Sequence, residues 1–413
     1  MGDFILLTKV TWRNLFRNFR RTGITVASIM SYTATIIFFV GIIDGFSKST
    51  YHNITHTLVG DVQLHAPGFR DSRSMYKAIR EPEKLMEQIR KLNRTEIKVV
   101  ARGLGIGLVS VGSKSAGGSF SGVTPKDEKL AFDLHTKMAK GSFLSEQAQQ
   151  EIVLGSRVAK SLNAKIGDEL VAVVQAADGS MGNELFTIKG ILLAVGESVD
   201  RNGLFIHRSD YDSLFMAAGR VHQMAFNGFN SIEPKELVAT FEPFYKEGDW
   251  KSWRELMPAL AKNLEMNDAS FWILGFIFAI AAALGTMNTM LMATHDRVRE
   301  FGVIRALGAS PWRIIRDIGY EAMLMGLIAT SLGGLLGAAV TYYFQIEGMD
   351  LSSFTSGNLE MAGIMVDSLW RADLSLKSIV FSMLLIFVIT VLSSLYPAVK
   401  SARLQPVTAM KHV

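Results

Sequence analysis

The chain has 413 residues, of which 49% are hydrophobic and 20% charged, and its mean hydropathy is +0.23. This composition excludes a disordered or collagen-like chain. The chain contains no cysteine, and this absence excludes disulfides, thiolate metal sites and cysteine nucleophiles.

Four segments carry no charged residue and are long enough to cross a bilayer: residues 22–43, 269–294, 322–346 and 378–399. A helix rises about 1.5 Å per residue, so about 20 residues cross a hydrocarbon core of about 30 Å. We therefore predict an integral membrane α-helical protein with four transmembrane helices in a 1+3 arrangement. The first segment is too long for the core of a signal peptide and is interpreted as a retained anchor.

The segments between these spans differ in charge. Residues 1–21 carry a net charge of +4, residues 295–321 of +1 and residues 400–413 of +3, whereas residues 347–377 carry −3 and residues 44–268 are neutral. Lys and Arg are concentrated in cytoplasmic loops of membrane proteins. Both termini and residues 295–321 are therefore predicted to be cytoplasmic, and residues 44–268 and 347–377 to lie outside. The net charge of +5 reflects this topology and does not indicate nucleic-acid binding.

The first 21 residues have the pattern of an amphipathic helix. Apolar residues from Phe4 to Phe19 recur at helical spacing, and basic residues from Lys9 to Arg20 fall on the opposite side. The pattern predicts a cytoplasmic helix that lies in the headgroup plane. A simpler alternative is a basic flank that ends the first span.

Residues 44–268 are predicted to form a large extracytoplasmic α+β domain with a β-rich subdomain at about 105–205. Short apolar runs predict strands at 62–67, 105–111, 151–155, 169–175, 186–195 and 203–206, and helical spacing predicts helices at 81–92, 156–162 and 210–217. Asp178-Gly179 between two apolar runs indicates a hairpin turn.

The chain lacks the common catalytic and nucleotide-binding motifs. Gly103, Gly105 and Gly107 match neither the dinucleotide fingerprint nor a P-loop, and no zinc-protease or serine-hydrolase motif is present. His52 and His56 are four residues apart, but no third metal ligand follows nearby. We therefore predict no catalytic, cofactor-binding or metal site in this chain.

Small residues line one side of the third predicted span. Ala329, Gly333 and Gly337 recur at steps of four, and such residues let helices approach closely in a membrane. The pattern is compatible with a subunit interface and with packing within one chain, and the sequence does not separate the two.

The loop between the second and third spans is the most informative part of the sequence. It predicts a short helix over 299–307, ended by Gly308, and a new helix that starts at Pro311 with Ser310 as N-cap. Phe301, Ile304 and Leu307 are predicted to form an exposed apolar ridge, with Arg299, Glu300 and Arg305 at its rim. An exposed apolar ridge on a short cytoplasmic helix is typical of a docking element.

Three sequence blocks resemble the FtsX/MacB/LolC-LolE superfamily of ABC transporter permeases. Residues 297–309 read R-V-R-E-F-G-V-I-R-A-L-G-A, like the coupling segment of that superfamily. Residues 12–22 resemble its opening, and residues 396–410 its ending. The arrangement of one span, a large domain and three spans is also similar.

The resemblance implies a multi-pass permease of the bacterial inner membrane that works as a dimer with two cytoplasmic ATPase subunits. ATP and Mg would then be bound by the ATPase, so the chain itself is no enzyme. Movement of the ATPases would push the coupling helix and change the shape of the extracytoplasmic domain. The implied docking residues are Arg297, Arg299, Glu300, Phe301, Gly302, Arg305, Ala306, Leu307 and Gly308.

Residues 60–69 and 253–258 are most similar to the LolC/LolE type. This similarity implies lipoproteins that are extracted from the outer leaflet and passed to a soluble carrier. An apolar site near the outer ends of spans one and two would then hold acyl chains, and the candidate contacts are Ile42, Ile43, Phe46, Phe271, Trp272 and Phe276. The alternative is that these side chains are ordinary contacts with membrane lipid.

Two other functions stay open within the superfamily. One is an FtsX-like regulator that activates a cell-wall hydrolase. The other is a MacB-like efflux permease, in which the ATPase is usually fused to the permease, and residues 1–21 leave no room for one. The sequence does not identify the ATPase, nor does it separate a homodimer from a heterodimer.

Overall fold

The computed structural model describes residues 12–13, 19–91, 97–228, 234–350, 359–361, 364–366 and 369–403. The chain divides into two compact units. The first contains residues 1–49, 264–351 and 369–413, and the second contains residues 50–263 and 352–368. Most of the predicted amphipathic helix and the end of the tail lie outside the described residues.

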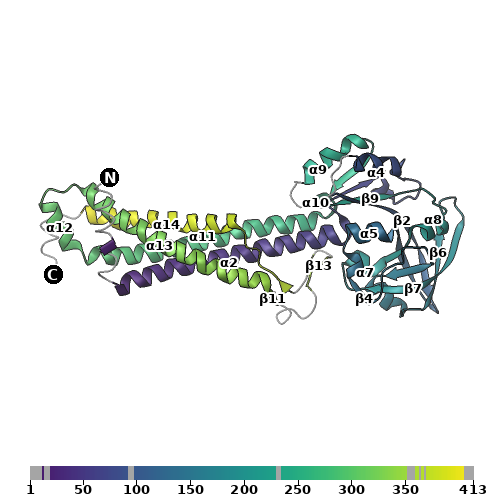
Figure 1. The fold of residues 1–413 in the computed structure, drawn as a ribbon, viewed down its shortest axis with the longest axis horizontal. Helices are drawn as coiled ribbons and strands as arrows, with labels where there is room; N and C mark the ends of the chain where they lie inside the picture. The colour runs from purple at the N-terminus through teal and green to yellow at the C-terminus, as the bar shows by residue number, and fades with distance from the viewer. Residues whose placement is uncertain are drawn as a thin grey trace. The chain divides into compact units, whose positions relative to one another are not determined.

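Four long helices dominate the first unit and lie alongside one another (Figure 1): α2 (Phe19–Ile54), α11 (Pro258–His295), α13 (Pro311–Ile346) and α14 (Leu376–Ala402). Each contains one of the four predicted spans, and each is apolar and long enough to cross a membrane. The prediction of a four-helix membrane protein is confirmed. Because α2 has 36 residues, it is about 54 Å long and exceeds a hydrocarbon core of about 30 Å.

A shared apolar core holds these helices together. It contains Ile29 and Ile36 of α2, Ala282 of α11, Ala329 of α13 and Ile386 of α14, all buried. Since each helix contributes, the core defines a single bundle.

The small residues of α13 pack within this chain. A Cβ atom at Gly333 would lie 2.7 Å from the carbonyl oxygen of Met30, and one at Gly337 would lie 2.9 Å from the Cα of Ala34. Real Cβ atoms essentially never come so close. Of the two interpretations left open by the sequence, the structure shows close packing of α13 on α2.

The segment before α14 is fastened to α2. The backbone N–H of Asp373 donates to the carbonyl oxygen of Gly41 at 2.8 Å, and the Asp373 carboxylate accepts from Lys48 at 2.5 Å. A Cβ atom at Gly45 would overlap the carbonyl oxygen of Arg371. Glycine at 45 therefore allows this segment to cross α2 in direct contact.

Two pairs of short strands precede this segment in the sequence. Strand β11 (Met349–Asp350) pairs antiparallel with β14 (Leu369–Trp370), and β12 (Leu359–Met361) pairs antiparallel with β13 (Ile364–Val366).

A ten-stranded sheet forms the centre of the second unit, in the order β10-β1-β9-β2-β3-β8-β5-β7-β4, with β6 paired to β2 and β7. Its strands are β1 (Val62–His65), β2 (Lys98–Val111), β3 (Lys114–Val123), β4 (Met138–Gly141), β5 (Glu151–Leu154), β6 (Glu169–Gln175), β7 (Met181–Leu192), β8 (Gly203–His207), β9 (Gln223–Asn227) and β10 (Asp249–Ser252). All neighbours are antiparallel except β3–β8 and β5–β7. The 14-residue strand β2 connects two parts of the sheet. Its first residues pair with β9, and its last residues pair with β3 and β6.

Short helices cover the sheet: η1 (Thr55–Val59), α3 (Phe69–Ser72), α4 (Pro82–Arg90), α5 (Pro125–Ala131), η2 (Leu134–Thr136), α6 (Ser156–Leu162), α7 (Glu197–Asn202), α8 (Arg208–Leu214), α9 (Pro234–Phe241), η3 (Glu242–Phe244) and α10 (Trp253–Leu256). One core lies among β3, β5–β8, α6 and α8, and a second among β1, β9, β10, α4 and α9. Each strand and helix predicted for this region is present, but β2 begins seven residues before the predicted strand at 105–111 and β7 five residues before the one at 186–195. Gly179, in the predicted hairpin turn between β6 and β7, has a φ of +87°.

Candidate functional site

The predicted coupling segment forms a separate short helix, α12 (Val298–Ala306), between α11 and α13. Gly308 follows it with a φ of +92°, a backbone conformation that favours glycine. Ser310 has the backbone conformation of an N-cap before Pro311, although its side chain makes no capping hydrogen bond. The predicted helix, stop and restart are therefore all present.

One face of α12 is buried against α13 and α14. Phe301 is only 4% exposed and packs with Ile314 and Ile318 of α13 and with Ala398 and Ala402 of α14. The prediction that Phe301 belongs to an exposed ridge is wrong, because its ring fills the space between α12 and the two longer helices. Gly302 is buried beside it.

Arg297 also faces the protein. Its guanidinium group forms an ion pair with Glu321 of α13 at 2.9 Å and contacts Glu300 at 3.1 Å. The same group lies over the ring of Phe301, 5.3 Å from its centroid. Because its side chain is only 16% exposed, Arg297 fixes α12 to α13 rather than presenting a charge to a partner.

The opposite face of α12 and the first turn of α13 expose apolar side chains. Leu307 is 83% exposed and Trp312 70%, and Val303 and Ile304 are exposed beside them. We call these four residues the exposed ridge. Arg299, Glu300, Ala306 and Gly308 are exposed too, whereas Arg305 is half-buried and donates to the carbonyl oxygen of Ala309 at 3.3 Å.

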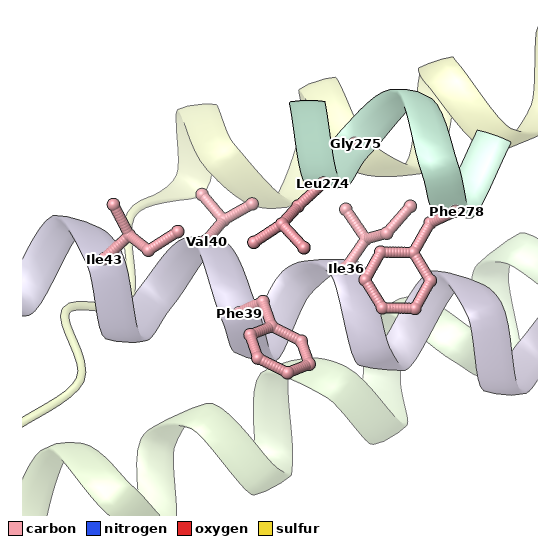
Figure 2. Close-up of a pocket in the computed structure, with 7 residues that line it drawn as sticks. All are labelled: Ile36, Phe39, Val40, Ile43, Leu274, Gly275 and Phe278. Carbon is pink, nitrogen blue, oxygen red and sulfur yellow. The ribbon is translucent and has the colours of Figure 1, made fainter. Parts of the chain in front are cut away.

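A second candidate site is an apolar groove between α2 and α11. It is lined by Ile36, Phe39, Val40 and Ile43 of α2 and by Leu274, Gly275 and Phe278 of α11 (Figure 2). The groove is shallow: it encloses about 10 Å³, and the rest of its space is open to the surroundings. None of the lining side chains carries a charge or a hydroxyl group, so the groove suits a hydrocarbon chain and not an ion.

Of the six residues predicted to contact acyl chains, the structure places Ile43 in this groove. Ile42 and Phe46 are buried on another side of α2, where Phe46 packs on Trp370 with ring centroids 4.6 Å apart. Steps of four residues place those two on one helix face, and a step of one moves Ile43 to the next. Ile42 and Phe46 therefore lie outside the groove, and their contact with acyl chains stays a prediction.

The predicted aromatic residues of α11 do not line the groove either. Trp272 and Phe276 are exposed, and the Trp272 ring contacts Phe381 of α14 edge-on at 5.9 Å. The side chain of Phe271 lies outside the described residues. The groove is also lined by Phe39, Leu274 and Phe278, which the sequence analysis missed. The sequence shows which residues share one face of a helix, but it does not show which faces of two helices pack together.

Two family models match the chain. The MacB-like periplasmic core domain matches residues 22–236, and the C-terminal domain of FtsX-like permeases matches residues 272–406.

Curated relatives agree with these matches. The lipoprotein-releasing system transmembrane protein LolC of Xylella fastidiosa is 24% identical over 307 residues, which are 70% of this chain and 72% of that protein. The macrolide export ATP-binding/permease protein MacB of Marinobacter nauticus is 24% identical over 379 residues, 83% of this chain and 54% of that protein.

Among solved structures, the periplasmic region of MacB from Actinobacillus actinomycetemcomitans matches with a TM-score of 0.36 and 15% identity, over 48% of this chain and 91% of that one. At that score the relationship rests on the family models, which together cover all four spans and most of the extracytoplasmic domain. The chain therefore belongs to the FtsX-like ABC transporter permeases with a MacB-like periplasmic core domain.

Proposed function

We propose that this permease releases acylated lipoproteins from the outer leaflet of the inner membrane and passes them to a soluble carrier. ATP would be hydrolysed by separate cytoplasmic ATPase subunits, and the permease would act as a homo- or heterodimer with both termini in the cytoplasm. The LolC relatives support the cargo through their name.

The observation that carries the choice of cargo is the groove between α2 and α11. Its lining is entirely apolar, and Ile43 at one end is followed at once by Asp44, where the charge-free span ends. A hydrocarbon chain entering from the outer leaflet would meet apolar side chains on both helices. Each methylene that leaves the groove for water would cost about 0.8 kcal/mol, so release requires an energy source such as ATP hydrolysis.

The exposed ridge of α12 supports coupling to an ATPase. Leu307 and Trp312 are large, apolar and exposed, and they lie in the segment that is predicted to face the cytoplasm. Such a surface suits a protein partner. Phe301 and Arg297 hold the helix against α13 and α14. A push on the ridge would therefore move α12 together with these two spans.

The test is purification of the tagged permease from native membranes in mild detergent, followed by mass spectrometry and reconstitution with ATP. We expect an ABC ATPase and acylated lipoproteins to copurify, and ATP to release the lipoproteins. The variant Gly275→Phe adds a ring at a residue that lines the groove, and the open space around a Cβ at 275 leaves room for it. We expect it to lose lipoproteins and retain the ATPase, whereas Ile277→Phe, on the exposed side of α11, should retain both.

Efflux is the second candidate, because the MacB protein of Marinobacter nauticus matches 83% of this chain. Copurification of an ATPase with a channel component and a small exported compound would favour it. Copurification with a cell-wall hydrolase, with no release of lipoprotein, would favour a regulator of the FtsX type. Either result would contradict the lipoprotein proposal.

A further inference from the structure

We propose that His52, His56 and Asp133 form a binding site for a zinc-type divalent cation at the carboxyl-terminal end of α2. The sequence predicts no metal site because the two histidines lack a third ligand nearby. The structure brings Asp133 to them from the turn between α5 and η2. The proposal is independent of the cargo and of the ATPase.

The three side chains converge closely. One ligand atom from each lies within 4.8 Å of the other two, and Nε2 of His52 is 3.3 Å from the carboxylate of Asp133. The two imidazole rings are stacked with centroids 4.1 Å apart. Two histidines and a carboxylate around one point are a common set of protein ligands for Zn²⁺, with water in the remaining position.

The backbone holds the two segments in register. The N–H of Asp133 donates to the carbonyl oxygen of His56 at 2.7 Å, which fixes the start of η2 beside the end of α2. At this point the α-helix gives way to the π-helical turn η1, and such turns often occur at functional sites. The distance between the ligand-bearing segments is therefore set by main-chain contacts and does not depend on the metal.

The site opens to solvent on the side of His52 and Asp133, whereas Nε2 of His56 is buried. The side chain of His52 is 56% exposed and that of Asp133 47%. His52 lies nine residues beyond the end of the charge-free span, about 13 Å along the helix. A hydrated cation could therefore reach the ligands without crossing lipid.

Asn227 contacts the ring nitrogen of His56 that would not bind the metal. Its side-chain nitrogen is 3.2 Å from Nδ1 of His56 and donates to the carbonyl oxygen of Ala131 at 2.7 Å. Nδ1 is then an acceptor, so Nε2 carries the ring proton in the metal-free protein. Metal at Nε2 moves that proton to Nδ1, and Asn227 must turn aside.

The donor atoms select the metal. Ca²⁺ and Mg²⁺ prefer six or more oxygen ligands, whereas imidazole nitrogens suit Zn²⁺ and Co²⁺. We therefore use Zn²⁺ in calorimetry and Co²⁺ in absorption spectroscopy, with the full-length protein in detergent. We expect saturable binding of one ion per chain and a rise of the thermal unfolding midpoint with Zn²⁺.

The variants separate this site from casual binding to surface histidines. His52→Ala and Asp133→Asn should each weaken binding at least tenfold. His135→Ala is the matched control, because His135 is two residues from Asp133 and contacts only the carbonyl oxygen of Phe132 among the bonds described for it. Absence of saturable binding would overturn the proposal. So would binding that Asp133→Asn leaves unchanged, since the histidine pair alone would then account for it.

Discussion

If the exposed ridge of α12 binds the ATPase, the substitution Leu307→Asp should weaken ATPase binding without lowering the stability of the permease. Leu307 is 83% exposed, so the change removes little packing and should alter the free energy of unfolding by less than about 0.5 kcal/mol. In a docked complex, a buried leucine contributes about 1.5–3 kcal/mol. At about 1.4 kcal/mol per tenfold, losing that contribution weakens ATPase binding roughly 10- to 100-fold.

The assay is a titration of the detergent-purified permease with its copurifying ATPase, run beside thermal unfolding. Phe301→Ala provides the contrast, because Phe301 is buried against α13 and α14. Removing a buried aromatic ring lowers the free energy of unfolding by about 3–5 kcal/mol, so this variant should lose stability and ATPase binding together. Leu307→Asp should lose binding alone.

Leu130→Asp serves as the control for a new surface charge. Leu130 is 63% exposed and lies in the second unit, so we expect neither stability nor ATPase binding to change. If Leu307→Asp left the ATPase affinity at the value of the control, the ridge would not be the docking surface. A loss of stability in Leu307→Asp would equally refute the reasoning, because it would mean that Leu307 is packed.

Three further predictions concern stability. Gly45→Ala should lower the thermal unfolding midpoint in detergent by an amount equivalent to about 1–3 kcal/mol, because its Cβ overlaps backbone, whereas Gly275→Ala in open space should be neutral or stabilising. Glu321→Gln should destabilise by about 1–3 kcal/mol in the same assay by leaving the half-buried Arg297 with less compensation, and Glu321→Asp should recover part of the loss. Burial lowers the pKa of His65 from 6.5 to about 4, so the unfolded chain takes up a proton that the folded domain refuses. Denaturant unfolding should therefore show stability falling by up to about 3 kcal/mol as the pH drops from about 6.5 to about 4, and His65→Gln should flatten that dependence.

The membrane architecture could be predicted because it depends on local properties. A span must be apolar over about 20 residues whatever its neighbours are, so the charge-free segments locate all four helices. The strands from Glu151 to Leu154 and from Glu169 to Gln175 were predictable for a similar reason, since their apolar runs are bounded by turn residues. The turn at Asp178-Gly179 requires a residue that tolerates positive φ.

Strand β3 could not be predicted, because its sequence contradicts ordinary strand preferences. It contains three glycines and three serines among ten residues, and glycine is unfavourable in a strand. The structure shows why they are there: a Cβ atom at Gly118 would overlap Leu204, and one at Gly122 would overlap the ring of Tyr211. These glycines serve partners more than 80 residues away in the sequence, so no local pattern identifies the strand.

The same reasoning explains why the coupling segment was predicted only in part. In an isolated helix, the apolar residues at 301, 304 and 307 lie on one face and form a single ridge. In the structure α12 touches two other helices, and the contact divides that ridge: Phe301 goes inward, while Ile304 and Leu307 stay outside. Phe301 packs against α13 and α14, and Arg297 is paired to Glu321 of α13. These two contacts fix the buried face of α12, so the exposed residues are carried by an anchored helix. A docking surface that must transmit force requires both parts, an exposed apolar contact and a buried anchor. The segment from Arg297 to Leu307 has them on opposite sides, which is the arrangement that the proposed docking requires.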